Sequence, residues 1–428
     1  MKTFVKLFGM LLLAAVTPIA FAETAQETPS APVEQPAPED ADQDVASDFS
    51  SFWGGFVGGQ VRKASGLTYK GFRFSPYFKT GPFYDSNVPL RKNDKGSAGW
   101  NYTPGADISY VGNDWGLTLG GFFSYDQYFD SKFDPEWTAS ESASIYKEKG
   151  NWRVMLAQSY QRNKDVSFGL VNDSSFDGYS RMRDTIDVSA AVSWKAGPKT
   201  TLSFTAGYQS YWYEDGQYSG YDTYNVAAEL ARRVTEKTDF LVNAGLSMRD
   251  SDLLAKMTYQ YSVMAGLGSR ISEKIGYRIM AGGMYYQFEN NQGKSDDTFA
   301  PTFYGSLVWQ LNRKWALTWS LNSGFTPSTT RAQADGYRLN YGTSLGVVYA
   351  MTRRLPLRAD GIVTLTNYQG SWGPQYDEWG DSESVRLSAA YELARHVFLF
   401  GSFKYYINNT GIQDYDQYRA DMGVTLRY

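Results

Sequence analysis

Apolar and polar residues alternate with a period of two along most of this chain, from about residue 67 to the C-terminus. In the final stretch, YRADMGVTLRY (418–428), every second residue from Tyr418 to Tyr428 is apolar, and the intervening residues are polar, charged or glycine. No helical period lasts long enough to compete. Because successive side chains of a β-strand point to opposite faces, the pattern predicts strands with one apolar and one polar face.

The alternation recurs as runs of about 10 to 14 residues, which is the length scale of strands that cross a membrane. Runs 67–78 and 137–147 are the weakest, so a count of 16 strands stays open beside the preferred count of 18. The predicted strands lie near 67–78, 100–111, 115–127, 137–147, 151–162, 183–194, 200–213, 221–233, 238–249, 256–270, 275–288, 299–311, 315–326, 336–351, 355–368, 383–393, 397–408 and 415–428.

The connections between these runs fall into two sets. Tight, charged turns such as TEK (235–237) and NRK (312–314) alternate with longer polar segments such as 79–99 and 163–181. Short turns at one end and longer loops at the other are typical of transmembrane β-barrels, and aromatic residues cluster at the run ends as interfacial girdles do. The sequence therefore predicts an all-β, antiparallel, up-and-down transmembrane barrel, with both barrel ends of the chain on the periplasmic side.

A soluble all-β sandwich or propeller is the alternative fold. Its outer face should carry frequent lysine and glutamate, and its apolar face should be buried. Here the polar face is small and sparsely charged, whereas the apolar face carries long aromatic side chains. This contrast favours the membrane barrel.

Three segments precede the barrel. Residues 1–22 carry only Lys2 and Lys6 as charges, followed by a short apolar core that ends in Ala-Phe-Ala, which predicts a cleaved signal peptide and export through the Sec pathway. Residues 23–48 contain eight acidic residues, four prolines and no Lys or Arg, which predicts a disordered periplasmic segment. Residues 49–66 are interpreted as a periplasmic or plug segment.

Composition excludes several kinds of chemistry. The chain has no Cys, so it has neither a disulfide framework nor a lipid-modified N-terminal cysteine. Its one histidine, His396, lies in a predicted periplasmic turn, which is a poor place for a general base. We expect no catalytic residue, no cofactor site, no metal site and no enzymatic activity.

The C-terminal residues resemble a known signal. A terminal aromatic residue preceded by alternate apolar residues, here Tyr428, Leu426 and Val424, is similar to the C-terminal signal of bacterial outer-membrane proteins. The resemblance implies recognition by the barrel-assembly machinery of a Gram-negative bacterium. Within this class, the glycine- and tyrosine-rich runs joined by tight charged turns resemble the putative β-barrel porins.

A barrel of 16 to 18 strands leaves an aqueous lumen. We therefore expect a porin-like channel for passive diffusion of small hydrophilic solutes, with anions and saccharides as candidates. The alternatives are an outer-membrane anchor or adhesin, and a barrel associated with polysaccharide export. Expected partners are outer-membrane lipid, the assembly machinery and the solutes, without nucleic acid; substrate, gating and oligomeric state stay open.

Arginine predominates among the charged residues that the alternation places on the polar face. One interpretation of each is a structural charge that solvates the wall, and the other is part of a basic wall that favours anions or acidic sugars. The third long loop is a candidate constriction through Asp165, Asp173 and Asp177, with an ordinary surface loop as the alternative. The pore-lining candidates are Arg153, Arg249, Arg278, Arg338, Arg358, Arg386, Lys404, Arg419, Asp421 and Arg427.

Overall fold

A computed structural model describes most of the region predicted to form the barrel. The described residues are 67–88, 95–165, 181–213, 220–251, 256–272, 274–289, 295–327, 337–352, 354–369, 379–409 and 415–428. The predictions for residues 1–22, 23–48 and 49–66 lie outside them. Among the described residues, no helix is long and apolar enough to cross a membrane.

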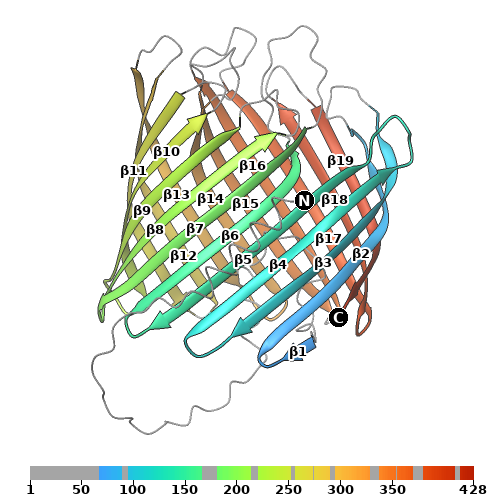
Figure 1. Cartoon of the computed structure of the whole chain (residues 1–428), viewed down its shortest axis with the longest axis horizontal. Coiled ribbons are helices and arrows are strands. Elements are labelled where there is room, and N and C mark those ends of the chain that lie inside the picture. Colours follow the sequence, from blue (N-terminus) through green and yellow to red (C-terminus); the bar gives the residue numbers. More distant parts are fainter. Residues whose placement is uncertain are drawn as a thin grey trace. The chain divides into compact units, whose positions relative to one another are not determined.

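All secondary structure in the described part is β-strand (Figure 1). A short strand, β1 (Leu67–Tyr69), folds back on the start of β2 (Phe72–Asp85). The remaining strands are β3 (Ser97–Val111), β4 (Trp115–Tyr128), β5 (Glu136–Lys149), β6 (Trp152–Asp165), β7 (Arg181–Gly197), β8 (Thr200–Tyr213), β9 (Tyr221–Arg233), β10 (Thr238–Ser251), β11 (Lys256–Ser272), β12 (Ile275–Glu289), β13 (Ser295–Gln310), β14 (Trp315–Pro327), β15 (Tyr337–Thr352), β16 (Leu355–Gln369), β17 (Trp379–Ala394), β18 (Val397–Asn409) and β19 (Tyr415–Arg427).

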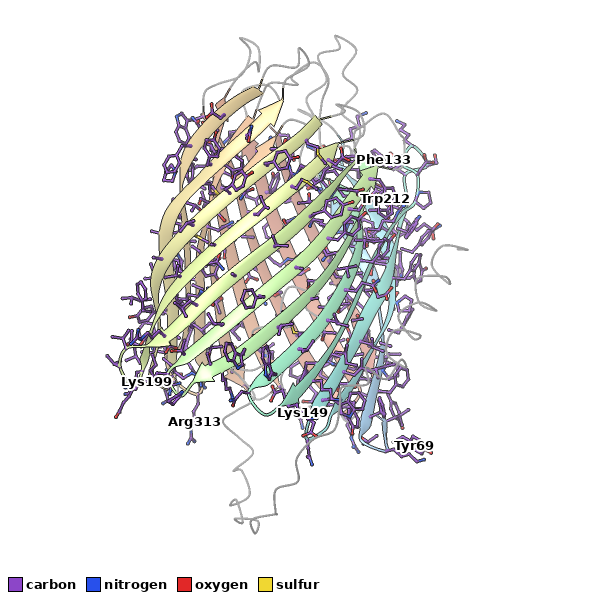
Figure 2. The ribbon with its side chains drawn as sticks, turned by 60° about the vertical axis from the view of Figure 1, so that its left-hand side comes forward. Tyr69, Phe133, Lys149, Lys199, Trp212 and Arg313 are labelled. Atoms are coloured by element: carbon purple, nitrogen blue, oxygen red, sulfur yellow. The ribbon has the colours of Figure 1, made fainter. Side chains whose placement is uncertain are left out.

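Strands β2 to β19 form a closed antiparallel barrel. Each strand pairs with its neighbours in the chain, and β19 pairs with β2, so the prediction of 18 strands is confirmed. One end of the barrel carries the tight turns and is called the turn end; the other carries the longer connections and is called the loop end. Lys149, Lys199 and Arg313 mark the turn end in Figure 2, whereas Phe133 and Trp212 lie at the loop end. The C-terminus also lies at the turn end (Figure 1).

The register shows that the two faces of the wall differ chemically all the way around. One face carries exposed large apolar side chains at alternate positions, and these include Val188, Phe204, Leu246, Val263, Leu267, Ile279, Leu345, Leu365 and Met422. Aromatic pairs lie toward the turn end of this face, such as Trp152 with Trp194 at 5.4 Å and Trp315 with Tyr349 at 4.3 Å between ring centroids. An apolar band edged by aromatic residues is the outer surface of a transmembrane barrel.

The seam between the first and last barrel strands contains a local interruption. The pairs Asp421 with Phe83 and Val424 with Thr80 are in register, but the two rows between them are not paired. Pro82 lies in this gap and has no N–H to donate. A Cβ at Gly423 would collide with the backbone oxygen of Thr80, so the close approach of the two strands requires glycine there.

Several strand boundaries differ from the predicted ones, and the largest difference is at the end of β2. Residues 79–99 were expected to form a loop, but β2 continues to Asp85 and β3 begins at Ser97. The segment TGPFYD (80–85) has turn-like composition, and its extended conformation comes from pairing with β3 on one side and β19 on the other. Tertiary pairing overrides local preference in this segment.

Candidate functional site in the barrel interior

Ion pairs between non-neighbouring strands identify the concave face of the wall. Arg419 of β19 reaches Asp126 of β4, although β2 and β3 lie between them. Arg278 of β12 reaches Glu229 of β9 across two strands. Side chains from strands this far apart converge only on the inside of a curved wall. The polar, charged face is therefore the interior of the barrel.

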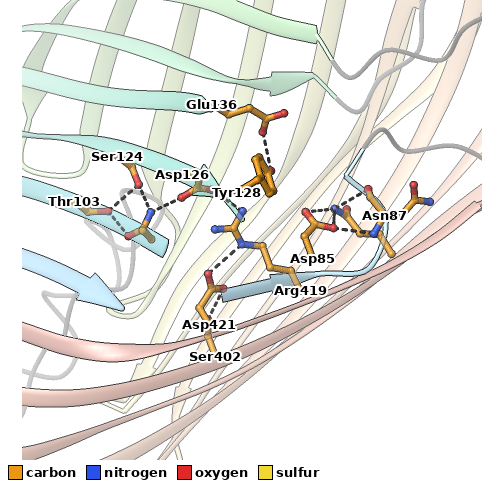
Figure 3. A network of polar contacts seen from close by, with 12 residues as sticks. Asp85, Asn87, Thr103, Ser124, Asp126, Tyr128, Glu136, Ser402, Arg419 and Asp421 are labelled. Atoms are coloured by element: carbon orange, nitrogen blue, oxygen red, sulfur yellow. Dashed lines mark hydrogen bonds and ion pairs between the residues drawn. The ribbon is translucent and has the colours of Figure 1, made fainter. Parts of the chain in front are cut away.

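Arg419 is the centre of a polar network inside the seam (Figure 3). Its Nη1 lies 2.7 Å from Asp126 Oδ2, and its Nε donates to Asp421 Oδ1 at 3.0 Å. The guanidinium also lies over the ring of Phe83, 4.3 Å from the centroid. Ser402 Oγ donates to the second oxygen of Asp421 at 3.2 Å. Arg419 thus connects β19 with β4 across the strands that close the barrel.

Neutral polar residues surround the acidic members of this network. Asn101 Nδ2 donates to Asp126 Oδ1 at 2.5 Å and to Ser124 Oγ at 2.7 Å. Gln417 Nε2 donates to both oxygens of Asp85 at 2.8 Å, and the backbone N–H of Asn87 donates to Asp85 Oδ1 at 3.0 Å. These bonds hold the carboxylates of Asp85 and Asp126, which both lie on the β2 side of the seam, in fixed positions (Figure 3).

A row of like charges crosses the wall beside this network. Arg386 of β17 pairs in register with Lys404 of β18, which in turn pairs with Arg419. An acidic residue lies at each end of the row, because Asp360 is the register partner of Arg386 and Asp85 is the register partner of Arg419. Directly opposed like charges destabilise a sheet, so three adjacent cations are costly unless other groups compensate them.

The three cations of this row differ in whether a carboxylate neutralises them. Arg419 has two carboxylate partners, whereas Arg386 and Lys404 form no ion pair within the described parts of the chain. Lys404 Nζ lies 5.8 Å from the ring centroid of Tyr406. Lys79 of β2 adds a further interior cation, with its Nζ 4.2 Å from the ring centroid of Phe400. This sector, formed by β17 to β19 and β2, presents cationic nitrogens to the interior.

The sequence-derived candidates can now be located. Those in the described part lie on the concave face, and Arg358 pairs there with Asp360, Arg427 with Asp107 at 3.7 Å and Arg153 with Glu148 at 3.2 Å. The structure brings together only part of the set, since Arg386, Lys404, Arg419 and Asp421 adjoin one another, whereas the others are spread over the wall. Their role as pore-lining residues stays a prediction.

Some candidates lie outside the described residues. Asp173 and Asp177 are among these, so the proposed constriction loop is not placed. Asp165 ends β6 and Arg338 lies in β15, but the side chains of both are outside the described part. At the C-terminus, Tyr428 stacks on His396 with 4.9 Å between centroids, and His396 Nδ1 lies 2.9 Å from the carbonyl oxygen of Arg427.

Sequence reasoning missed several functional candidates. Lys79 and Asp85 fell in a segment interpreted as a loop, and Asp126 follows the inward alternation of β4 but was not singled out. Arg162 and Asp184 depart from the alternation rule, because they form a 3.0 Å ion pair on the outward face of β6 and β7. Arg162 also lies over Trp137, 3.8 Å from its ring centroid.

Within the described ranges, no group of three or more His, Asp or Glu side chains could hold a metal ion. The arrangement offers fixed charges and hydrogen-bonding groups around an interior space, which suits reversible contact with polar solutes.

No protein-family model and no curated protein matches the sequence. Among solved structures, the outer membrane protein OpdK from Pseudomonas aeruginosa is 12% identical, with 83% of this chain and 99% of that chain covered at a TM-score of 0.42. OccK11 (OpdR) of the same organism is 12% identical, with 87% and 99% covered at 0.43. The FrpB iron transporter from Neisseria meningitidis (F3-3 variant) is 9% identical at 0.43; 79% of this chain is covered, and it spans 62% of that chain.

Proposed function

We propose that this protein is an outer-membrane channel for small hydrophilic solutes and that it prefers anions. The observation that carries the proposal is the row Arg386–Lys404–Arg419 on the concave wall of a closed barrel. Barrels of this strand number have room for an aqueous path. Two cations of the row have no carboxylate partner within the described residues, so a passing anion can interact with both.

Reconstitution into planar bilayers tests this proposal. The wild-type protein should give an ohmic conductance, and its reversal potential in a KCl gradient should have the sign expected for chloride preference. The variant Arg386→Gln/Lys404→Gln should shift the reversal potential toward the value for a non-selective pore, because two fixed positive charges are lost from the wall.

Arg313→Gln is the matched control. Arg313 is an exposed cation in the turn between β13 and β14, outside the barrel interior (Figure 2). Its removal should leave the reversal potential unchanged. Absence of conductance from correctly folded protein would contradict the channel, and equal shifts in both variants would contradict the role of the cationic row.

A further inference from the structure

The pairing between β13 and β14 stops halfway up the barrel wall. The two strands are in register from Gln310 with Ala316 to Tyr304 with Asn322. Above this row, β13 continues from Phe303 up to Ser295 and pairs with β12, while β14 continues to Pro327 and pairs with β15. The barrel wall therefore contains a split between β13 and β14 at the loop end.

Local chemistry explains why the ladder ends at this row. The backbone N–H of Phe303 donates to Ser323 Oγ at 2.9 Å, and the same hydroxyl lies 3.4 Å from the carbonyl oxygen of Phe303. A side chain thus replaces the backbone partner. Two residues further along β13, Pro301 has no N–H with which pairing could resume. At the two other places where proline interrupts the barrel ladder, near Pro82 and Pro104, pairing resumes within two rows.

The split lies at the upper edge of the apolar band. Ser323 is eight residues above Trp315, which belongs to the aromatic pairs near the turn end. At about 3.3 Å per residue and a strand tilt of about 40°, this spacing is roughly 20 Å along the barrel axis. The apolar band of such barrels is about 25 Å tall. The split therefore opens where the acyl chains of the outer leaflet meet its head groups.

A closely packed apolar cluster lies on the concave side of the wall next to the split. Met264, Met280 and Met284 lie on the concave faces of β11 and β12 with Tyr286, and Met280, Met284 and Tyr286 are 2%, 4% and 0% exposed. This cluster is connected to the split itself, because Ser323 Oγ lies 3.1 Å from Thr302 Oγ1, which lies 3.9 Å from the sulfur of Met264. Methionine side chains are unbranched and adapt to apolar ligands of varied shape.

A cation lies above this cluster, nearer the loop end. Arg249 is on the concave face of β10, in register with Thr258 of β11 and, through it, with Phe288 of β12. The guanidinium lies over the ring of Tyr221 at 4.0 Å, and its buried Nη1 has no hydrogen-bond partner among the described residues. A head group that accepts a hydrogen bond from Nη1 would satisfy this donor.

The inward side of the wall is open at one position beside the split. A Cβ at Gly324, which faces inward beside the split, would meet no atom within 4 Å. On the outer surface, Phe299 flanks the split and is 70% exposed. From outside to inside, the features at the split are thus an exposed ring, the unpaired rows of two strands and the methionine cluster.

We propose that the split between β13 and β14 is a lateral portal for an amphiphile with an anionic head group and one apolar chain. The chain inserts among Met264, Met280 and Met284, whose flexible side chains are closely packed in its absence, and Arg249 binds the head group. In this orientation the head group is nearer the loop end than the chain, as it is in the outer leaflet. The proposal does not depend on conduction of ions along the barrel axis.

Cross-linking across the split tests the portal, and the absence of native Cys makes the experiment clean. Thr302→Cys/Gly324→Cys places thiols on opposite sides of the split, and Ser306→Cys/Ser320→Cys places them on a paired row of the same strands. Oxidation should join the control pair rapidly and the split pair slowly, because a disulfide requires Cα atoms about 4.4 to 6.8 Å apart. Equally rapid joining of both pairs would overturn the open split.

A bifunctional thiol reagent long enough to bridge the split should then close the portal. Binding of dansyl-labelled undecanoate, supplied either in the liposome bilayer or in water, is followed by dansyl fluorescence. Closure should slow binding from the bilayer at least about tenfold and have less effect on binding from water, and a reductant should restore the rate. An unchanged rate from the bilayer after complete cross-linking would overturn the lateral route.

The two ends of the binding site are tested separately. Arg249→Gln should weaken dansyl-undecanoate binding about tenfold but leave the neutral dansyl-undecanamide unaffected, whereas Met284→Gln should weaken both about tenfold. If Arg249→Gln binds dansyl-undecanoate as tightly as the wild type does, Arg249 does not bind the head group. KCl conductance of the same preparations reports on the axial channel, so failure of the portal and failure of the channel are distinguishable.

Discussion

Replacing Arg419 by methionine should destabilise the barrel more than any other single loss of an interior ion pair described above. Arg419 donates to two carboxylates, and the three side chains are 25%, 13% and 20% exposed. Two hydrogen bonds to charged groups contribute about 1.5 to 3 kcal/mol each. Asp126 keeps its bond from Asn101 and Asp421 keeps its bond from Ser402, so we expect a net loss of about 2 to 3 kcal/mol.

The matched control is Arg153→Met. Arg153 also lies on the concave face and pairs with Glu148, but the two side chains are 52% and 51% exposed. An ion pair in that setting contributes at most about 0.5 to 1 kcal/mol. The free energy of unfolding is measured by urea titration in lipid vesicles, with the fraction of heat-modifiable folded protein as the readout. Equal losses of unfolding free energy in the two variants would refute the reasoning that the ion pairs of Arg419 stabilise the closed barrel.

Three further changes test the fold. Val242→Arg places a charge on the outer face of β10 and should lower the free energy of unfolding by about 2 to 4 kcal/mol. Asn243→Arg places the same charge on the inner face and should lower it much less. Similar unfolding free energies for the two variants would contradict the assignment of faces. Gly423→Val should prevent closure of the seam and abolish the folded band on a gel. Gly401→Val should fold, because its added Cβ meets no atom within 4 Å. The opposite outcome would contradict the close approach of the strands at the seam. Removal of Tyr428 should lower the yield of folded protein in the outer membrane, because the ring is stacked on His396 and is expected to act as an assembly signal; an undiminished yield would contradict that role.

Local sequence predicted the barrel because its physical cause is local. A wall between lipid and water imposes a period of two on every strand, and tight turns favour glycine and short polar residues. The runs ending near Ala394 and beginning at Val397 were therefore located from the sequence to within a residue or two. The end of β2 is not predicted because residues 80–85 are extended only through pairing with β3 and with β19, and β19 is more than 300 residues away in the chain.

The arrangement of the interior could not be predicted in the same way. The alternation predicts that Arg419 points inward. It does not predict the contact between Arg419 and Asp126, because that contact depends on the curvature of the wall. The end of the ladder at Ser323 is likewise a property of two strands and not of one. Period-two reasoning also fails at Arg162 and Asp184, where an ion pair with an adjacent tryptophan occupies the outward face.

The central claim is that the charged face of the wall lines a water-filled, conducting path. Cysteine substitution at neighbouring positions of β18 tests it directly, with modification by a negatively charged methanethiosulfonate reagent during single-channel recording. Lys404→Cys should react and change the current within the recording, whereas Phe403→Cys, which points to the lipid side, should give no change. A change in current at Phe403→Cys without one at Lys404→Cys, or no current from either folded variant, would contradict the account.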